Sequence, residues 1–322
     1  MKNIAVINQS YDDSSIGKIA DGLHQHLLSL NYNSFLLYGC GDEPKDPTYV
    51  KFENEFERYI HALATRITGR QGCYSYFATK RLIRKLEELK IDTIYGVCLH
   101  GYYLNERLLF ECISKRGIKF IYVIIDEYPY LGKCWSSNGC TRYLSGCGNC
   151  PQKKVYPASF FLDGSRHIYN NKATWYPRMK DCVFAGPEFS IKNAIKSPLM
   201  KGIRLEIIDE GIDIDFYSYR EPENLRKKLG ISNDKIIIFS TASFRLKNGA
   251  FYVELARRLE NNPQYVFVHS GNKEAPENMP SNYIFVGFVP ADELPTYYSL
   301  ADLFVFTSMQ DCMPNTCLES LA

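Results

Sequence analysis

Short, wholly apolar runs that lead into helical segments recur along this chain and constrain its fold most strongly. Residues 120–125 read FIYVII and residues 303–306 read LFVF, and polar residues bound each run. Such runs are typical of strands that are buried on both faces of a parallel sheet. Because helical segments alternate with strands in both halves of the chain, we predict an α/β protein with two doubly wound, Rossmann-like domains that face a cleft.

The length of 322 residues accommodates two domains of this kind. We expect the first domain to span residues 1–217, with a cysteine-rich insertion at residues 132–152, and the second to span residues 218–322. The last residues resemble the first turns of a helix. We therefore expect the second domain to be incomplete, as in a C-terminally truncated product.

Composition argues against several classes of protein. The 38 Lys and Arg against 36 Asp and Glu leave a net charge of +2, which does not favour a nucleic-acid partner. No apolar run approaches the roughly 18 residues that a membrane span needs. The start of the chain, MKNIAVINQSYDD, turns polar too early for a signal peptide. We expect a cytoplasmic protein, with loose attachment to the inner face of the membrane as a further option.

The loop after the last apolar run carries two carboxylates. Asp311 and Glu319 are separated by seven residues, and Pro314, Asn315 and Thr316 between them mark a helix start. A strand that feeds a helix amino terminus is where open α/β sheets bind anions. Because carboxylates repel phosphate, we expect these two to accept hydrogen bonds from sugar hydroxyls. The pattern predicts a nucleotide-sugar site, and the alternative is an ordinary loop with two solvated acids.

A second loop supplies positive charge. Arg245 and Lys247 follow the apolar run at residues 235–241 and precede another helical segment. Cationic side chains in such a loop neutralise the charge that develops on a leaving nucleoside diphosphate. The alternative is a charged surface loop without a ligand.

Three residues of the first half stand where a sheet of this type meets its ligands. Gly17 lies in the first turn of a helical segment, where the missing side chain lets a ligand approach the backbone. His100 follows the strand at residues 91–98, and Asp126 follows the strand at residues 120–125. Both therefore lie at carboxyl ends of strands, where α/β proteins place working residues. The alternatives are a tolerated glycine and a structural histidine.

Four cysteines are clustered in the sequence GKCWSSNGCTRYLSGCGNCPQ, at Cys134, Cys140, Cys147 and Cys150. Four thiolates suit tetrahedral Zn²⁺ in a closed, structural site. The other interpretations are two disulfides, which a reducing compartment disfavours, and a redox CxxC pair. We predict a structural zinc ion.

Taken together, these motifs resemble the retaining GT-B glycosyltransferases of family four, the glycosyl transferases group 1 type. The segments SSIGKIA at residues 14–20 and LHGYYLN at residues 99–105 resemble a bacterial capsular polysaccharide subgroup with a four-cysteine insertion. The resemblance implies a hexosyltransferase that moves a sugar, with retention, from a UDP- or GDP-linked donor. The acceptor would be a glycan or lipid-linked molecule in capsular or surface polysaccharide synthesis. Cationic side chains and helix termini would make a catalytic metal unnecessary.

The resemblance also implies roles for individual residues. The implied catalytic residues are Asp126, His100 and Asp311, and the implied donor-binding residues are Gly17, Arg245, Lys247, Asn315, Thr316 and Glu319. Two positions depart from the pattern: Asp311 stands where the family usually has Glu, and Ile125 stands where the subgroup has a His that faces the donor sugar. Because an isoleucine cannot form a hydrogen bond, that contact is not inherited.

Other functions remain open at this point. A nucleotide-sugar epimerase would use the same fold, and the substitution at Ile125 also fits a non-catalytic sugar-nucleotide-binding protein. The basic region from Phe56 to Leu89 is either a set of solvated helix faces or a contact with anionic lipid.

Overall fold

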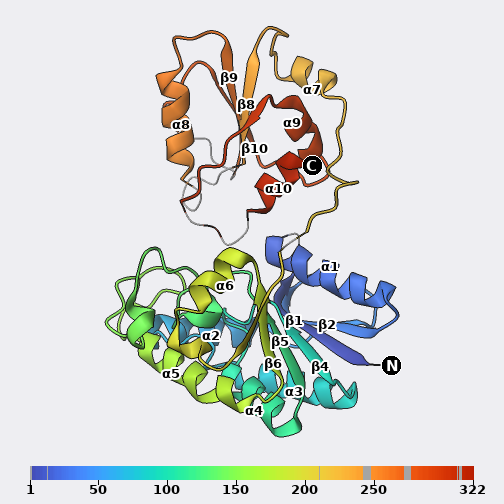
Figure 1. The fold of residues 1–322 in the computed structure, drawn as a ribbon, viewed down its shortest axis with the longest axis vertical. Coiled ribbons are helices and arrows are strands. Elements are labelled where there is room, and N and C mark those ends of the chain that lie inside the picture. Colours follow the sequence, from blue (N-terminus) through green and yellow to red (C-terminus); the bar gives the residue numbers. More distant parts are fainter. Residues whose placement is uncertain are drawn as a thin grey trace. The chain divides into compact units, whose positions relative to one another are not determined.

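The computed structural model describes residues 2–12, 14–209, 211–241, 248–271, 277–309, 311 and 314–322. The chain forms two compact units, Met1–Asp209 and Glu210–Ala322, here called the N-terminal and C-terminal units. Each unit is an α/β structure built on a parallel sheet (Figure 1). The predicted α/β class with parallel sheets is confirmed.

The N-terminal unit contains a seven-stranded sheet with the order β3-β2-β1-β4-β5-β6-β7. Its strands are β1 (Asn3–Tyr11), β2 (Asn33–Gly41), β3 (Tyr49–Lys51), β4 (Thr93–Gly96), β5 (Lys119–Val123), β6 (Cys182–Gly186) and β7 (Arg204–Ile207). Its α-helices are α1 (Ser15–Ser29), α2 (Glu55–Thr68), α3 (Tyr76–Glu88), α4 (Glu106–Arg116), α5 (Ser165–Trp175) and α6 (Glu188–Ala194). Short 3₁₀ turns lie at Tyr128–Tyr130, Arg142–Ser145, Tyr176–Arg178 and Pro198–Met200.

Both faces of this sheet are buried, which explains the apolar character of its strands. In β1, Ile4 and Val6 join a core cluster with Ala20 of α1. The alternate residues Ala5 and Ile7 join the main cluster with residues of α3 and α4. Because successive strand residues point to opposite faces, burial on both faces requires an uninterrupted apolar run.

Helix boundaries in this unit follow local capping chemistry. The side chain of Asn54 accepts a hydrogen bond from the Glu57 N–H at the start of α2. The side chain of Asn105 accepts one from the Leu108 N–H at the start of α4. The helix α2 ends at Gly69, whose φ of 69° is a left-handed conformation that glycine adopts without steric cost. These caps fix the start of both helices and the end of α2.

The C-terminal unit contains a four-stranded parallel sheet with the order β10-β9-β8-β11. Its elements are α7 (Glu223–Lys228), β8 (Ile236–Ser240), α8 (Gly249–Arg258), β9 (Tyr265–Ser270), β10 (Tyr283–Gly287), α9 (Leu294–Leu300), β11 (Leu303–Phe304) and α10 (Asn315–Leu321). In β8, Ile237 and Phe239 pack in the cluster that contains Leu300 of α9, whereas Ile238 packs with Tyr252 of α8. This sheet is therefore also covered on both faces.

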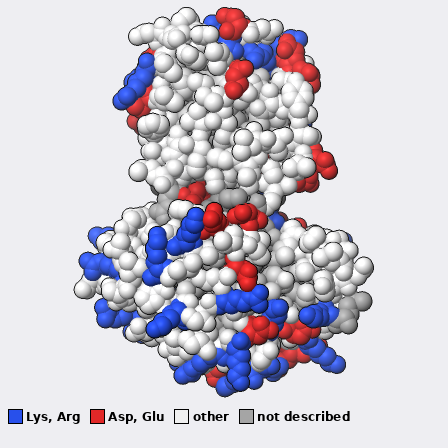
Figure 2. All heavy atoms as spheres, viewed as in Figure 1, with Lys and Arg blue, Asp and Glu red and all other residues white. Residues whose placement is uncertain are grey.

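The surface of the N-terminal unit carries charges of both signs. On the face shown in Figure 2, Lys and Arg side chains are interspersed with Asp and Glu. Among the described residues, no helix is both long enough and apolar enough to cross a bilayer.

Candidate functional site

His100 and Asp126 lie together at the carboxyl edge of the seven-stranded sheet. His100 lies in the loop after β4, and Asp126 lies in the loop after the neighbouring strand β5. The distance from His100 Nε2 to Asp126 Oδ2 is 2.6 Å. The structure thus brings together two of the residues that the sequence singled out.

The pair is largely enclosed, with 11% of the His100 side chain and 18% of the Asp126 side chain exposed. Burial opposes a charge on His100, but the neighbouring Cys98 and Asp126 together raise the pKa of His100 well above its usual value. The Tyr128 backbone N–H donates to Asp126 Oδ1 at 2.9 Å, which fixes the carboxylate. Among the described residues, the other ring nitrogen of His100, Nδ1, is buried and has no hydrogen-bond partner by distance and angle, although the Cys98 thiol lies near the ring.

This geometry determines what the pair can do. Asp126 orients the imidazole and favours its charged form, so Nδ1 becomes an N–H donor for which the described part of the chain supplies no acceptor. A buried donor without a partner costs free energy, unless a ligand oxygen supplies the missing acceptor. The pair can therefore hold a hydroxyl or phosphate oxygen in a defined place.

The loop that carries His100 is fixed by a glutamine that sequence reasoning missed. Gln71 Oε1 accepts a hydrogen bond from the Gly101 N–H at 3.0 Å, and Gln71 Nε2 donates to the Lys133 carbonyl at 3.0 Å. Gln71 is 1% exposed. It connects the His100 loop to the cysteine-rich segment, and no pattern in the sequence distinguishes it from a surface glutamine.

Two other positions of the N-terminal unit have local explanations. A Cβ atom added at Gly17 would lie 2.2 Å from the Asp12 carbonyl oxygen, so the close approach of the Asp12 loop to α1 requires glycine there. Ile125 packs against the apolar cluster that contains Ile4 and Val6. Its side chain therefore serves the core next to Asp126.

In the C-terminal unit, Glu319 lies in α10 and is held by tyrosines. The Tyr298 hydroxyl donates to Glu319 Oε2 at 2.7 Å. Burial together with the nearby Glu319 carboxylate raises the pKa of Tyr217 to about 12. Sequence reasoning missed both tyrosines, because Tyr298 reads as a packing residue of α9 and Tyr217 lies in the irregular segment before α7.

The other residues predicted for donor binding are described unequally. Asp311, Asn315 and Thr316 are partly exposed, and the buried atom Asn315 Oδ1 has no hydrogen-bond partner among the residues that the structure describes. Arg245 and Lys247 lie outside the described residues. The two cationic residues of the predicted diphosphate loop therefore remain sequence predictions.

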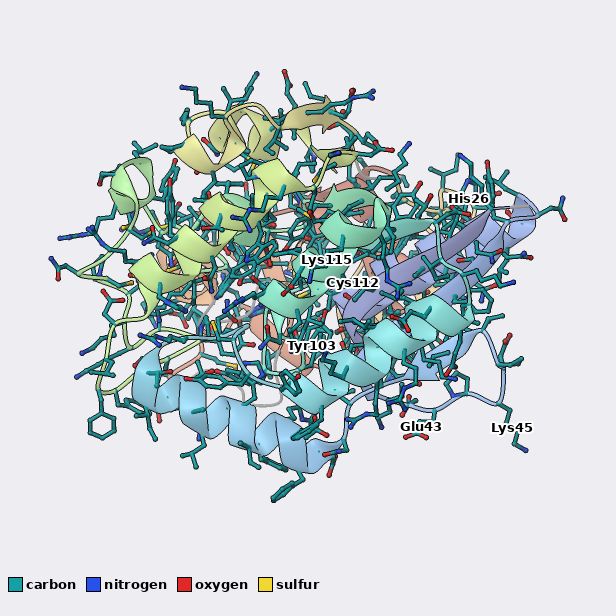
Figure 3. The ribbon with its side chains drawn as sticks, turned by 90° about the horizontal axis from the view of Figure 1, so that it is seen from below. His26, Glu43, Lys45, Tyr103, Cys112 and Lys115 are labelled. Atoms are coloured by element: carbon teal, nitrogen blue, oxygen red, sulfur yellow. The ribbon has the colours of Figure 1, made fainter. Side chains whose placement is uncertain are left out.

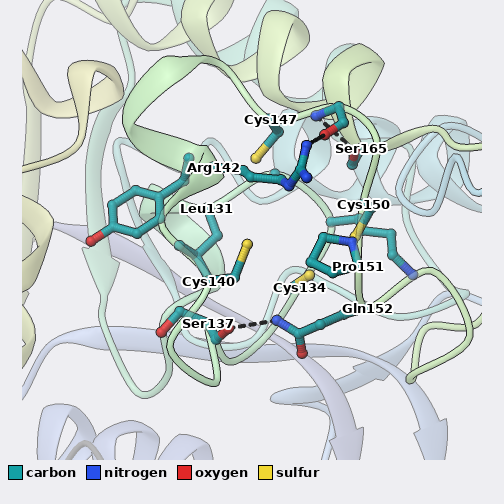
Figure 4. Close-up of a pocket in the computed structure, with 14 residues that line it drawn as sticks. Leu131, Cys134, Ser137, Cys140, Arg142, Cys147, Cys150, Pro151, Gln152 and Ser165 are labelled. Carbon is teal, nitrogen blue, oxygen red and sulfur yellow. Dashed lines mark hydrogen bonds between the residues drawn. The ribbon is translucent and has the colours of Figure 1, made fainter.

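The four clustered cysteines line one small pocket of about 20 Å³, and their sulfur atoms point into it (Figure 4). The Cys134 thiol hydrogen-bonds to Cys150, which lowers the pKa of Cys150 to about 7 and raises that of Cys134. Burial raises the pKa of Cys147 to about 11. Within the described part of the chain, no group of three or more His, Cys, Asp or Glu side chains is arranged to hold a metal ion. The predicted zinc site therefore finds no support in the described residues.

Two buried lysines hold this cysteine-rich segment in place. Lys172 Nζ donates to the carbonyls of Tyr128, Leu131 and Gly132 at 2.5, 3.1 and 3.1 Å. Lys133 Nζ donates in the same way to the carbonyls of Lys153, Val155 and Pro157. Each ammonium thus supplies the hydrogen bonds that three backbone carbonyls of this irregular segment need.

Comparison with known sequences gives a family match in the C-terminal unit. Residues 221–322 match the family described as glycosyl transferases group 1. A protein of Escherichia coli K12 named as a colanic acid biosynthesis glycosyl transferase, WcaC, is 22% identical over 99% of this chain and 81% of its own length. The alpha-galactosylglucosyldiacylglycerol synthase of Streptococcus pneumoniae is 27% identical over 50% of this chain and 46% of its own length.

Comparison with solved structures extends the similarity to both units. The Anabaena protein HepE, solved in complex with UDP and glucose, aligns with a TM-score of 0.59 over 100% of this chain and 78% of its own, at 13% identity. Sucrose-phosphate synthase from Thermosynechococcus elongatus aligns with a TM-score of 0.63 over 100% of this chain and 79% of its own, at 12% identity. The C-terminal unit thus matches the glycosyl transferases group 1 family, the sequence relatives are named as glycosyltransferases, and both units share the fold of solved glycosyltransferase structures.

Proposed function

We propose that this glycosyltransferase moves a sugar from a UDP- or GDP-linked donor to a glycan or lipid-linked acceptor with retention of configuration. The reaction would serve the synthesis of capsular or other surface polysaccharide, and it would take place on the cytoplasmic side of the membrane. The relative named for colanic acid biosynthesis supports a polysaccharide product. The structure of HepE with UDP and glucose supports a nucleotide-sugar donor.

We assign the acceptor side and the transferred sugar to the N-terminal unit. His100 would donate a hydrogen bond to a sugar or phosphate oxygen through Nδ1, and Asp126 would keep its ring oriented and charged. Gly17 would keep the loop before α1 close to the donor phosphates. His100 would take the place of the contact that Ile125 cannot make.

We assign nucleotide binding to the C-terminal unit. Arg245 and Lys247 would neutralise the charge on the departing diphosphate. Asp311 would accept hydrogen bonds from sugar hydroxyls. The ribose and neighbouring groups would be bound by Asn315, Thr316 and Glu319. The contact between Tyr298 and Glu319 supports this role, because it holds the Glu319 carboxylate in one orientation before a ligand arrives.

The observation that carries the proposal is the His100–Asp126 pair with its unpartnered, buried Nδ1. A purely structural histidine would satisfy both of its ring nitrogens within the protein. His61 in the same unit does so, through contacts with Ser75 Oγ and the Gly72 N–H. The contrast supports a ligand contact at His100.

The test is a donor panel with the purified protein. UDP-glucose, UDP-galactose and GDP-mannose are each incubated with a polyprenyl-phosphate-linked sugar acceptor, and the products are separated by chromatography. We expect one donor to release its nucleoside diphosphate only when the acceptor is present, and NMR of the product to show the anomeric configuration of the donor. An isomerised donor without diphosphate release would indicate an epimerase. Donor binding without any turnover would indicate a non-catalytic protein.

A further inference from the structure

The helix α2 turns its apolar side outward. Its large exposed side chains are Phe56, Tyr59, Ile60, Leu63 and Ile67, with exposed fractions of 73, 66, 51, 60 and 44%. Their spacing of three and four residues places them on one face of the helix. A surface helix of a soluble protein ordinarily does the reverse and buries this face.

The inward side of α2 is polar and firmly anchored. His61 and Thr65 are both completely buried there. His61 Nδ1 lies 2.7 Å from Ser75 Oγ, and the Gly72 N–H donates to His61 Nε2 at 3.2 Å. Burial lowers the pKa of His61 to about 3, so the ring stays neutral within this network. Turning α2 to bury its apolar face would break these hydrogen bonds, and the outward orientation is therefore a fixed feature of the fold.

Two further apolar segments adjoin the ends of α2. At the start of α3, Tyr76 and Phe77 are 51 and 68% exposed, and the adjacent Ala78 N–H donates to Glu57 of α2. At the other end, residues 160–162 expose Phe160, Phe161 and Leu162 by 56, 69 and 58%. The N–H groups of Phe160 and Leu162 donate to the carbonyls of Arg66 and Ile67.

We call these ten apolar side chains the α2 face. They are Phe56, Tyr59, Ile60, Leu63, Ile67, Tyr76, Phe77, Phe160, Phe161 and Leu162. In Figure 3, α2 lies at the edge of the N-terminal unit, beside α3. Monomeric proteins rarely expose an apolar patch of this extent unless it binds something.

The charges around the α2 face indicate what it binds. Residues 58–85 contain seven cationic residues and no Asp or Glu: Arg58, Arg66, Arg70, Lys80, Arg81, Arg84 and Lys85. Three of them, Arg58, Arg81 and Lys85, form ion pairs with Glu55, Glu57 and Glu88, which leaves Arg66, Arg70, Lys80 and Arg84 as the cations that can contact a ligand. Of the acids next to the α2 face in the sequence, Glu55 at the start of α2 and Asp163 beyond Leu162 are exposed. A second copy of the chain, docked through the same face, would set one cationic cluster against the other. Anionic lipid head groups instead complement it.

We propose that the α2 face docks the protein on an anionic membrane surface. The apolar side chains enter the interface between head groups and acyl chains, and the surrounding Lys and Arg contact the lipid phosphates. Docking would bring the N-terminal unit to lipid-linked acceptors, so it deepens the proposed function. Its evidence is independent, since it rests on the exposure and charge of α2 and not on the sugar-nucleotide site.

The test is flotation of the purified full chain with phosphatidylcholine vesicles that contain phosphatidylglycerol, against vesicles of phosphatidylcholine alone. We expect binding to the anionic vesicles that weakens with added salt. Ile60→Gln and Leu63→Gln should each weaken it about tenfold, because each removes one large apolar side chain from the interface. Arg66→Gln should weaken it about fivefold. The matched control Ile195→Gln changes a side chain of the same unit that is 64% exposed but lies outside the α2 face, and it should leave binding within about twofold.

Several outcomes would overturn the proposal. One is wild-type binding that is equally weak on both vesicle types. Another is a Leu63→Gln variant that floats like the wild type. A third is light scattering that shows a dimer which Leu63→Gln converts to monomer, because this would make a second copy the occupant. Flotation needs neither donor nor acceptor, so a failure here is distinct from a failure of sugar transfer. Unchanged thermal unfolding of the variants checks that they fold.

Discussion

Replacing Lys172 by methionine should destabilise the N-terminal unit by about 3 kcal/mol. Methionine keeps most of the apolar volume of the side chain but removes the ammonium that donates to three carbonyls. Each buried carbonyl left without a donor costs about 1–3 kcal/mol, which gives a gross loss of roughly 3–9 kcal/mol. The ammonium also lies 3.2 Å from the centre of the Tyr128 ring, and that contact is lost as well.

An opposing contribution reduces this loss. Burial lowers the pKa of Lys172 from 10.5 to about 8, so the folded protein carries the charge at a cost of about 3 kcal/mol at neutral pH. Methionine relieves that cost, which leaves the net effect of about 3 kcal/mol. Between pH 8 and 10.5 the unfolded chain keeps a proton that folded Lys172 has released. The free energy of unfolding of the wild type, measured relative to Lys172→Met, should therefore rise with pH across this window.

The assay is urea unfolding followed by tryptophan fluorescence. Both tryptophans, Trp135 and Trp175, belong to the N-terminal unit, so the signal reports this unit alone. Lys201→Met is the matched control, because Lys201 is exposed and its loss should cost less than about 0.5 kcal/mol. A Lys172→Met variant as stable as the control, or a difference that falls between pH 8 and 10.5, would refute the reasoning.

Three other predictions follow from buried or hydrogen-bonded groups. Burial raises the pKa of Glu53 to about 8, so folded Glu53 keeps a proton that the unfolded chain loses above its ordinary pKa near 4.5. The free energy of unfolding of the wild type should therefore fall, relative to that of Glu53→Gln, as pH rises from 5 to 8. A difference in urea unfolding that does not change with pH would contradict this. Cys150, with a pKa of about 7, should be alkylated by iodoacetamide at pH 7 well before the buried Cys182, whose pKa is about 12. If mass spectrometry shows that Cys150 is alkylated as slowly as Cys182, the hydrogen bond between Cys134 and Cys150 is disproved. Tyr298→Phe removes one hydrogen bond to Glu319 and should weaken donor binding about fivefold by calorimetry, and unchanged affinity would argue against Glu319 as a ligand residue.

The sequence predicted those parts of the fold that depend on local pattern. Apolar runs such as residues 120–125 identify strands because a strand covered on both faces cannot carry polar side chains. The meeting of His100 and Asp126 followed from the same pattern, since carboxyl ends of adjacent parallel strands share one edge. That β4 and β5 are adjacent is a fact of topology that the structure supplies.

Other features could not be predicted because they depend on tertiary contacts. Lys172 reads as a solvated residue of α5, yet it is completely buried. The apolar spacing in α2 identifies a helix with two unlike faces but does not say which face meets solvent. That choice is made by His61, whose contacts with Ser75 and Gly72 draw the polar side inward. The zinc prediction failed to find support for a similar reason, because cysteine spacing does not specify how the thiols pair.

The most direct test of the central claim compares His100→Ala with His26→Ala in release of nucleoside diphosphate from the accepted donor. His26 is an exposed residue of α1 and serves as the matched control. If His100 Nδ1 binds a donor oxygen, kcat/KM should fall at least about tenfold in folded His100→Ala and should stay at the wild-type value in His26→Ala. Equal kcat/KM values for the two folded variants would contradict the account.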